Sequence, residues 1–309
     1  MKKVSVVIPV YYNEESLPLL FTEILAVEQK LLEKKMQLEL IFVDDGSGDG
    51  SLQELLKIKQ QRQNVKVVKH TRNFGAVRAS KTGLQFVTGD CFLFLAADLQ
   101  DPPELILQMV EKWQAGTKYV IGARSERGDP IMTKIFAYLY YKLVRLFVVE
   151  DYPAGGAVAL MDRSFLPYLQ NSSKSIYTPL LAHWLGFQPE LLHYKRPKRI
   201  HGKSRWTFFK KWGAFLDSIL SFTIVPLRLI SLVGLVVSIV SFGYGFWVVL
   251  NALFGNPAVT DVQGFATLVA LISFLLGLII IMLGVIGEYI WRIFDEVSKR
   301  PEAVIDEVY

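Results

Sequence analysis

The 309-residue chain has a single cysteine, Cys91, so it can form no internal disulfide, and a secreted disulfide-stapled scaffold is excluded. Cys91 lies in the apolar run CFLFLAA, which predicts a buried thiol. The four histidines, at positions 70, 183, 193 and 201, show no zinc-like spacing with cysteine. A zinc site is therefore not expected.

The N-terminal segment is not expected to be a signal peptide, because its apolar run is short and the carboxylates of Glu14 and Glu15 follow it at once. Basic residues outnumber acidic ones, 34 to 29, which gives a net charge of +5. Such a balance suits an anionic membrane surface, a phosphate-rich ligand or nucleic acid. Only the isoelectric point, about 9.1, suggests nucleic acid, and no nucleic-acid partner is expected.

Charged residues are absent from two long segments, Leu229–Phe254 and Val262–Gly287. Hydrophobic residues make up 51% of the chain, and the excess is concentrated after about residue 228. Each segment exceeds the roughly 20 apolar residues that cross a bilayer core. Buried helices of a soluble protein are the alternative, but two runs of this length favour membrane spans.

The connector Gly255–Asp261 contains no lysine or arginine, whereas Arg228 precedes the first span and Arg292, Lys299 and Arg300 follow the second. The positive-inside rule then predicts an integral protein of an inner or plasma membrane, with both termini and the N-terminal domain cytoplasmic. Two spans are too few for a pore, so we expect an anchor. Glycines within the spans are compatible with a homo-oligomer.

The N-terminal part alternates apolar strands with amphipathic helices, which predicts an α/β domain with a mainly parallel sheet. Strands are expected at Lys3–Val10, Leu38–Val43, Val65–Lys69 and Asp90–Ala96. Helices are expected at Glu15–Lys35, Ser51–Gln61 and Ala76–Thr88. In such a sheet, ligands bind outside the carboxyl ends of the strands.

Polar residues follow each of these strands, and together they are expected to form one rim. Singly, each group could be an ordinary turn or helix cap. The carboxylates of Glu14, Asp44 and Asp45 can accept hydrogen bonds from a base and ribose. Asp98 and Gln100 lie two positions apart and offer the oxygen ligands that Mg²⁺ or Mn²⁺ prefers beside a diphosphate.

Four motifs at these strand ends together resemble family 2 glycosyltransferases, which have a Rossmann-like GT-A fold. They are SVVIPVYYNE at Ser5–Glu14, VDDGS at Val43–Ser47, RNFG at Arg72–Gly75 and ADLQDPPE at Ala97–Glu104. The similarity covers roughly residues 3–300. The segment Ser221–Arg228 and the two spans after it resemble polyisoprenyl-phosphate glycosyltransferases, in particular bactoprenol glucosyltransferases. Dolichyl-phosphate mannose synthases resemble the chain less closely.

Processive polysaccharide synthases share the fold but carry a Gln-x-x-Arg-Trp motif. Here Gly202 stands where that motif needs glutamine before Arg205 and Trp206, so we reject that interpretation. The resemblance instead implies inverting transfer of a sugar to a polyisoprenyl phosphate, such as undecaprenyl phosphate, for lipopolysaccharide or cell-surface glycan modification. UDP-glucose is the expected donor, and mannose, galactose or an aminosugar stay open.

The resemblance also implies residue roles. Asp98 and Gln100 would bind the metal, Mg²⁺ or Mn²⁺, and Asp98 and Arg124 would act at the reacting centre. The residues implied in nucleotide-sugar binding are Pro9, Tyr11, Glu14, Asp44, Asp45, Arg72, Asn73, Ala97 and Gln100. The residues implied in contacts with the acceptor phosphate are Arg199, Lys203 and Arg205, and Lys134, on the expected interfacial helix at 130–149, is a further candidate for that contact.

Two positions depart from the family pattern. Ala96 stands at the first acidic position of the usual Asp-x-Asp, and Ala157 stands where many relatives have an acidic residue near the acceptor. A catalytically degenerate lipid-sugar binding protein is therefore the alternative to an enzyme. Because a lipid phosphate is already anionic, positioning and neutralisation matter as much as a general base.

Two basic, aromatic-rich segments, Pro130–Val149 and Trp206–Phe222, are typical of amphipathic helices in a membrane interface, with core helices as the alternative. The expected organisation has four parts. They are a cytoplasmic catalytic domain at 1–205 with its interfacial helix at about 130–149, a juxtamembrane helix at 206–227, two transmembrane helices at 228–289, and a cytoplasmic tail at 290–309.

Overall fold

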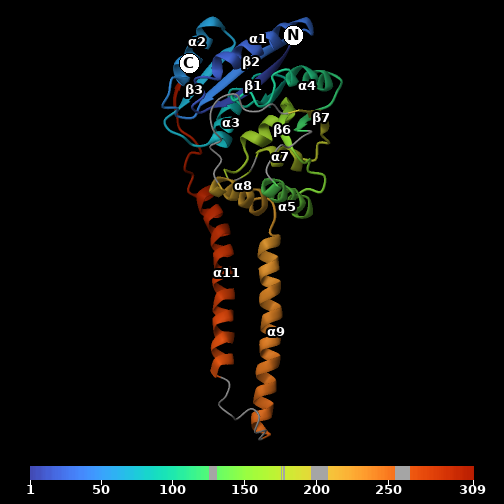
Figure 1. The fold of residues 1–309 in the computed structure, drawn as a ribbon, viewed down its shortest axis with the longest axis vertical. Helices are drawn as coiled ribbons and strands as arrows, with labels where there is room; N and C mark the ends of the chain where they lie inside the picture. The colour runs from blue at the N-terminus through green and yellow to red at the C-terminus, as the bar shows by residue number, and fades with distance from the viewer. Residues whose placement is uncertain (125–130, 175, 177, 196–207, 255–264) are drawn as a thin grey trace. The chain divides into compact units, whose positions relative to one another are not determined.

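A computed structural model describes residues 1–124, 131–174, 176, 178–195, 208–254 and 265–309. The chain divides into two compact units. The first comprises Met1–Ser221 and Arg300–Tyr309, and the second comprises Phe222–Lys299. The first unit is an α/β domain, and the second contains two long helices (Figure 1).

The α/β unit is built on one sheet, whose eight strands in the described residues have the order β7-β5-β6-β4-β1-β2-β3-β8. Strands β3, β2, β1 and β4 are mutually parallel, so their carboxyl ends share one edge. Strand β6 is antiparallel to β4 and β5, while β7 is parallel to β5. The strands are β1 (Lys2–Val10), β2 (Met36–Asp44), β3 (Val65–His70), β4 (Cys91–Phe94), β5 (Tyr119–Arg124), β6 (Gly156–Asp162), β7 (Glu190–Tyr194) and β8 (Ile305–Val308).

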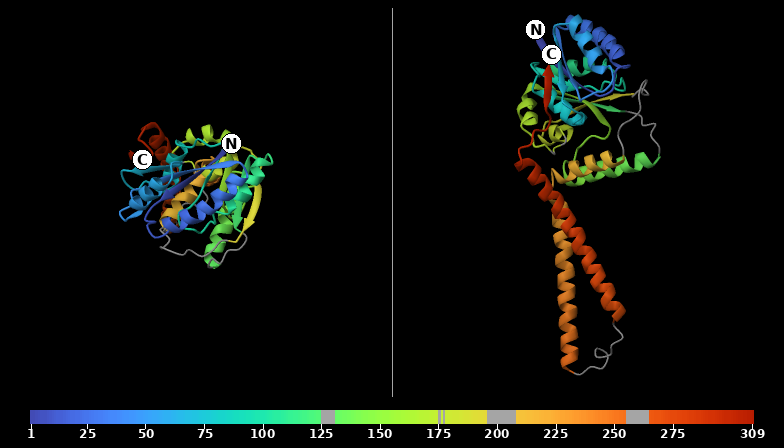
Figure 2. Two further views of the ribbon diagram at one scale, coloured as in Figure 1. Left: turned by 90° about the horizontal axis from the view of Figure 1, so that it is seen from above. Right: turned by 90° about the vertical axis from the view of Figure 1, so that its left-hand side faces the viewer.

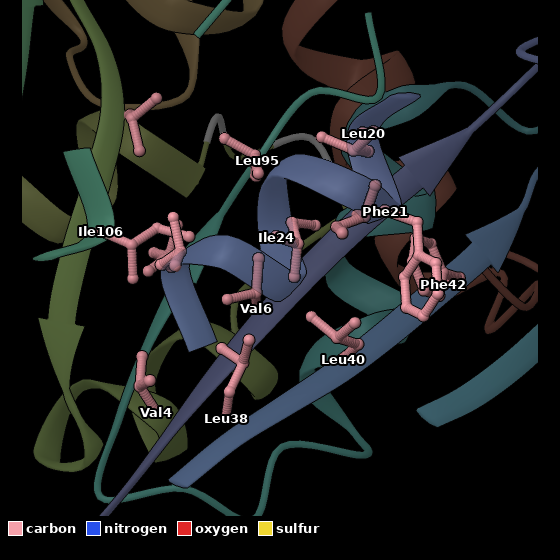
Figure 3. Close-up of a cluster of buried hydrophobic side chains, with 14 of the residues drawn as sticks. Val4, Val6, Leu20, Phe21, Ile24, Leu38, Leu40, Phe42, Leu95 and Ile106 are labelled. Carbon is pink, nitrogen blue, oxygen red and sulfur yellow. The ribbon is translucent and has the colours of Figure 1, made fainter. Parts of the chain in front are cut away.

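Helices cover both faces of this sheet, which confirms the predicted α/β class. A core of apolar side chains lies between the sheet and α1, α2 and α4, and Figure 3 shows Phe21 and Ile24 of α1 over β1 and β2. The helices of this unit are α1 (Leu17–Glu33), α2 (Ser51–Gln61), α3 (Ala76–Leu84), α4 (Leu105–Gln114), α5 (Ile131–Phe147), α6 (Leu166–Gln170), α7 (Thr178–Trp184) and α8 (Phe208–Leu220).

Helix α3 packs on the opposite face, against the alternate side chains of β1 and β2. Val6 and Ile8 belong to the α1 core, whereas Val7 faces Gly83 of α3. A Cβ atom on Gly83 would lie 2.3 Å from Val7 Cγ1, so glycine permits this close helix–sheet contact. Cys91 of β4 is fully buried, as predicted, and burial raises the pKa of its thiol.

The C-terminal residues differ from the expected tail. Ile305–Val308 form β8, which pairs antiparallel with the outer strand β3. The Tyr309 and Val67 backbones exchange two hydrogen bonds, of 2.8 and 3.2 Å. Glu302 also forms an ion pair of 2.6 Å with Lys81 of α3. The sequence of residues 290–309 gave no strand signal, because β8 is short, acidic and at an edge.

Helices α5 and α8 lie side by side beneath the rest of the α/β unit (Figures 1 and 2). The hydroxyl of Tyr140 donates to Ser218 Oγ at 3.2 Å, and the Tyr140 ring lies 6.3 Å from that of Phe215. Unit 1 therefore includes α8, which the sequence had assigned to a separate juxtamembrane segment. Large apolar side chains of α5 remain exposed, namely Ile135, Phe136, Tyr138, Leu139 and Leu146.

The second unit contains α9 (Val225–Leu253) and α11 (Phe265–Val297). Two stretches in the described residues are long and apolar enough to cross a membrane, Val225–Trp247 and Phe274–Val297. Neither is buried within the structure, and Phe242 is 80% exposed. By length and composition, both helices could span a membrane.

Candidate active site

The loops after β1 and β2 are joined by hydrogen bonds at the shared carboxyl edge of the sheet. Ser47 Oγ accepts from Tyr12 N at 3.1 Å, and Ser51 Oγ accepts from Asn13 N at 2.8 Å. The Glu14 carboxylate accepts from Gly50 N at 2.9 Å. These bonds join the Tyr12–Glu14 segment to the loop that follows Asp44.

Asp45 connects this pair of loops to the loop after β3. Its carboxylate accepts from the backbone N–H groups of Phe74 and Gly75, each at 2.8 Å, and lies 3.0 Å from His70 Nδ1. The Asp45 side chain is only 2% exposed. In this structure Asp45 therefore holds the Arg72–Gly75 loop, and its predicted contact with a nucleoside remains a prediction.

Asp44 ends β2 beside Asp45 and is also buried. Burial raises the pKa of the Asp44 carboxyl group, while hydrogen bonds from Ser47 oppose that shift. Arg72 and Asn73 remain exposed at the same edge, with the Arg72 guanidinium 4.2 Å from the centre of the Phe74 ring. Pro9, at the end of β1, is partly exposed there as well.

Gly46 allows the β2 and β3 loops to touch through their backbones. It has φ +69°, and a Cβ atom there would lie 2.6 Å from the carbonyl carbon of Arg72 and 2.8 Å from Asn73 N. Backbone atoms cannot yield as a flexible side chain can. Glycine at this position is therefore required both by conformation and by space.

We expect Gly46→Ala to destabilise the protein by roughly 2–4 kcal/mol, from left-handed strain and overpacking combined, and to weaken nucleotide binding. Thermal melting and UDP titration measure the two effects. Gly116→Ala is the matched control, because Gly116 has φ +110° and open space around the new Cβ. Equal losses in the two variants would contradict a specific role for the close contact at Gly46.

The loop after β4, residues 95–104, carries the predicted metal and diphosphate ligands. Asp98 Oδ1 accepts from Gln100 N at 3.2 Å, which places both side chains on one turn. Leu99 between them has φ +58°, an uncommon backbone conformation for leucine. Ala97 is buried, and its carbonyl accepts from Ser16 Oγ at 2.7 Å, so the start of α1 anchors this loop.

The residues present fit a divalent ion held jointly with a diphosphate. In the described part of the chain, no group of three or more acidic, histidine or cysteine side chains forms a ready-made metal cage. Asp98 and Gln100 are partly exposed oxygen donors at the sheet edge. Mg²⁺ and Mn²⁺ commonly take few protein ligands, with phosphate oxygens and water completing the shell.

The residues predicted on the acceptor side are less closely grouped. Arg124 ends β5, and its backbone N–H donates to Gly155 O at 3.1 Å. Position 157 is the second residue of β6. Lys134 is exposed on α5, and Arg199, Lys203 and Arg205 lie outside the described residues.

An apolar cavity of about 190 Å³ lies on the α3 face of the sheet. It is enclosed by the start of α3, the start of α7 and strands β4, β5 and β6. Its lining includes Val77, Phe94, Tyr119, Tyr152 and Met161. Such a lining suits apolar groups better than sugar hydroxyls or phosphates, which would lose hydrogen bonds to water there.

Comparison with known proteins decides the family. Residues 5–166 match the profile of Glycosyl transferase family 2. The chain belongs to this family. It is 34% identical over 310 residues to an uncharacterized glycosyltransferase of Synechocystis, covering 99% of this chain and 96% of that one. This glycosyltransferase is also 34% identical to the prophage bactoprenol glucosyl transferase homolog of Escherichia coli, with 99% of both chains covered.

A relative from Shigella phage SfII, named bactoprenol glucosyl transferase, is 34% identical over 98% of this glycosyltransferase and 97% of the phage protein. Among solved structures, glucosyl-3-phosphoglycerate synthase of Mycobacterium tuberculosis with phosphoglyceric acid is 17% identical, with a TM-score of 0.48. That match covers 71% of this chain and 80% of the synthase. The family assignment rests on the profile and on the full-length relatives.

Three residues of the site have no signal in the sequence patterns used above. His70 bridges Asp45 and Thr82, Ser16 supports Ala97, and Tyr194 of β7 contacts Asp101 of the β4 loop. Their partners are 12 to 93 positions away in the chain. Only the pairing of His70 with the acidic end of β2 could have been suspected, since the residues after both strands are expected on one rim.

Proposed function

We propose that this family 2 glycosyltransferase transfers glucose from UDP-glucose to a polyisoprenyl phosphate, such as undecaprenyl phosphate, with inversion at the anomeric carbon. One observation carries the proposal: relatives named bactoprenol glucosyl transferase match the chain over almost its whole length, including both long apolar helices. The proposed setting is the cytoplasmic face of an inner or plasma membrane.

The donor half of the site supports nucleotide-sugar binding. The edge formed by β3, β2, β1 and β4 gathers the predicted side chains of Tyr11, Glu14, Asp44, Arg72 and Asp98. Carboxylates there can accept hydrogen bonds from base and ribose. Arg72 can neutralise part of the phosphate charge. A bound Mg²⁺ or Mn²⁺ at Asp98 and Gln100 would stabilise the negative charge of the departing diphosphate.

The acceptor half supports a lipid substrate. Helix α8 ends at Leu220, and the first apolar stretch begins at Val225, so only a few residues separate the two along the chain. Exposed apolar side chains on α5 alternate with Lys134, Lys142 and Arg145, as in helices that lie in a membrane interface. In such an interface the Lys134 ammonium group can bind an anionic lipid headgroup.

In the proposed reaction an oxygen of the lipid phosphate attacks the anomeric carbon while the bond from that carbon to the diphosphate oxygen breaks. The acceptor approaches from the side opposite the leaving group, which inverts the configuration. Because the phosphate oxygen is already anionic, no proton has to be removed from it. Arg124 and Lys134 are proposed to orient and neutralise the two phosphate groups.

The test is transfer of radiolabelled glucose from UDP-glucose to undecaprenyl phosphate by the purified full-length protein, with Mn²⁺ or with chelator. Inside-out and right-side-out vesicles are compared in parallel, because UDP-glucose does not cross the bilayer. We expect the purified protein to form lipid product with Mn²⁺ and not with chelator. We expect inside-out vesicles to form the product when UDP-glucose is added to the external medium, because a cytoplasmic active site faces that medium. Ala157→Asp is assayed beside the wild type, and a gain of about 10-fold or more would show that this chain lacks a catalytic carboxylate at position 157.

Absence of lipid product from UDP-glucose and from other common nucleotide-sugars, in the wild type and in Ala157→Asp alike, would overturn the enzymatic proposal. The remaining account would then be a lipid-sugar binding protein, which Ala96 and Ala157 favour as the second candidate. Lipid product formed from GDP-mannose but not from UDP-glucose would support the proposed lipid acceptor and would show that the donor is GDP-mannose.

A further inference from the structure

The donor and acceptor halves meet at a buried contact between β5, β7 and the β4 loop. Arg124 and Tyr194 are register partners in the parallel β5–β7 pair, so their side chains stand on the same face of the sheet. The Tyr194 ring lies over Gly122, where an added Cβ would be 3.4 Å from Tyr194 Cε1. This packing fixes the plane of the ring.

Tyr194 links two charged groups through one hydroxyl. The hydroxyl donates a hydrogen bond to Asp101 Oδ1 and accepts one from the Arg124 guanidinium. Tyr194 is 8% exposed and Asp101 is 4% exposed. Burial, together with the neighbouring Asp101 carboxylate, raises the pKa of the Tyr194 phenol, so the hydroxyl stays protonated and keeps its donor role.

Arg124 retains hydrogen-bonding capacity toward a ligand. Its Nε atom is buried and has no hydrogen-bond partner among the residues that the structure describes. A buried guanidinium nitrogen without an acceptor is costly, and an anionic oxygen would satisfy it. The β4 loop that Tyr194 contacts through Asp101 also carries Asp98 and Gln100, the predicted ligands of the metal and the diphosphate.

We infer that Tyr194 is a positioning residue that locks the β4 loop to Arg124, so that Asp98 and Arg124 engage the same diphosphate. This inference rests on the proposed function for the identity of the anion. Tyr194 does not touch the reacting atoms. It sets the distance between a group on the β4 loop and a group at the end of β5, and its loss would loosen the position of the loop relative to the guanidinium.

The first test compares Tyr194→Phe with wild type by calorimetric titration of UDP in the presence of Mn²⁺, using the full-length protein. Removing the hydroxyl leaves the buried Asp101 without this donor, and we expect UDP affinity to fall by about 10-fold or more. In the transfer assay, kcat is expected to fall by about 10- to 100-fold, while KM for undecaprenyl phosphate stays within about twofold. Tyr168→Phe, which removes a hydroxyl from a tyrosine that is 57% exposed on α6, should match wild type.

A second measurement separates positioning from general stability. If Tyr194 acts through Arg124, the losses of UDP affinity in Tyr194→Phe and Arg124→Lys will be non-additive in the double variant. Additive losses, or a Tyr194→Phe protein with wild-type UDP affinity and kcat, would overturn the inference. If the wild-type protein binds UDP with Mn²⁺ but forms no lipid product, the proposed acceptor is wrong. The UDP titrations of the variants then still test the Tyr194 inference.

Discussion

An Asp98→Asn variant is expected to lose metal-dependent sugar transfer by about 10²–10³-fold. Asparagine keeps the side-chain oxygen that accepts from Gln100 N at 3.2 Å, so the turn should survive. It removes the negative charge that would hold a divalent ion against the diphosphate. Ala96 leaves no second carboxylate at the usual neighbouring position, so the effect should be larger than in a relative with both.

The measurement is initial transfer rate against Mn²⁺ concentration, accompanied by a melting curve. Glu111→Gln is the control, because Glu111 is an exposed carboxylate of α4 that pairs with Lys34. It should retain wild-type transfer and nearly wild-type stability, since exposed ion pairs contribute little. An Asp98→Asn protein that folds and still transfers within about threefold of wild type would show that Asp98 is not the metal ligand.

The sequence predicted the half of the fold that follows simple periodicity. The four parallel strands and helices α1 to α3 appear within a few residues of the predicted limits, because each buries a continuous or regularly spaced apolar set. Helix α9 also begins and ends within a few residues of its prediction, whereas α11 extends to Val297, ten residues beyond the predicted end at Gly287. Helix α2 matches its predicted range at both ends. The convergence of polar residues on one edge then follows from parallel pairing alone.

Elements that depend on distant partners were not predictable in this way. Strand β8 has two adjacent acidic residues, Asp306 and Glu307, and forms a strand because it pairs with the edge of β3. Leu99 adopts φ +58° although leucine carries no local preference for it, so the loop around it must impose the conformation. Tyr194 contributes to the site only because β7 pairs with β5 across a long sequence separation.

The division of roles between the two adjacent aspartates was also hidden in the sequence. The pair Asp44–Asp45 was read as two carboxylates for a nucleoside. Asp45 has hydrogen bonds to Phe74, Gly75 and His70 within the protein, which fix the neighbouring loop, and its contact with a nucleoside remains a prediction. A motif shows which residue types gather at a site, whereas the hydrogen bonds show which of them are already engaged.

Deletion of residues 300–309 is expected to lower the stability of the α/β unit by roughly 3 kcal/mol or more. The backbone bonds of β8 and Tyr309 to β3 contribute about 1 kcal/mol each, and Tyr309 also packs against the core. For a unit of this size, such a loss corresponds to a fall in melting temperature of about 6–12 °C. UDP affinity should fall as well, because Glu302 pairs with Lys81 on α3, the helix that begins at the Arg72–Gly75 loop.

Two point variants separate the strand from its surface charges. Lys69→Ala removes the exposed ion pair with Asp306, 2.5 Å long, and should cost less than about 1 kcal/mol. Glu302→Gln removes the partner of Lys81, which also donates to Ser172 O at 2.5 Å, and should weaken UDP binding more than it lowers the melting temperature. If the deletion melts at the wild-type temperature, β8 does not stabilise the sheet. If it melts lower with unchanged UDP affinity, β8 acts on stability alone, and the link through α3 to the donor edge is wrong.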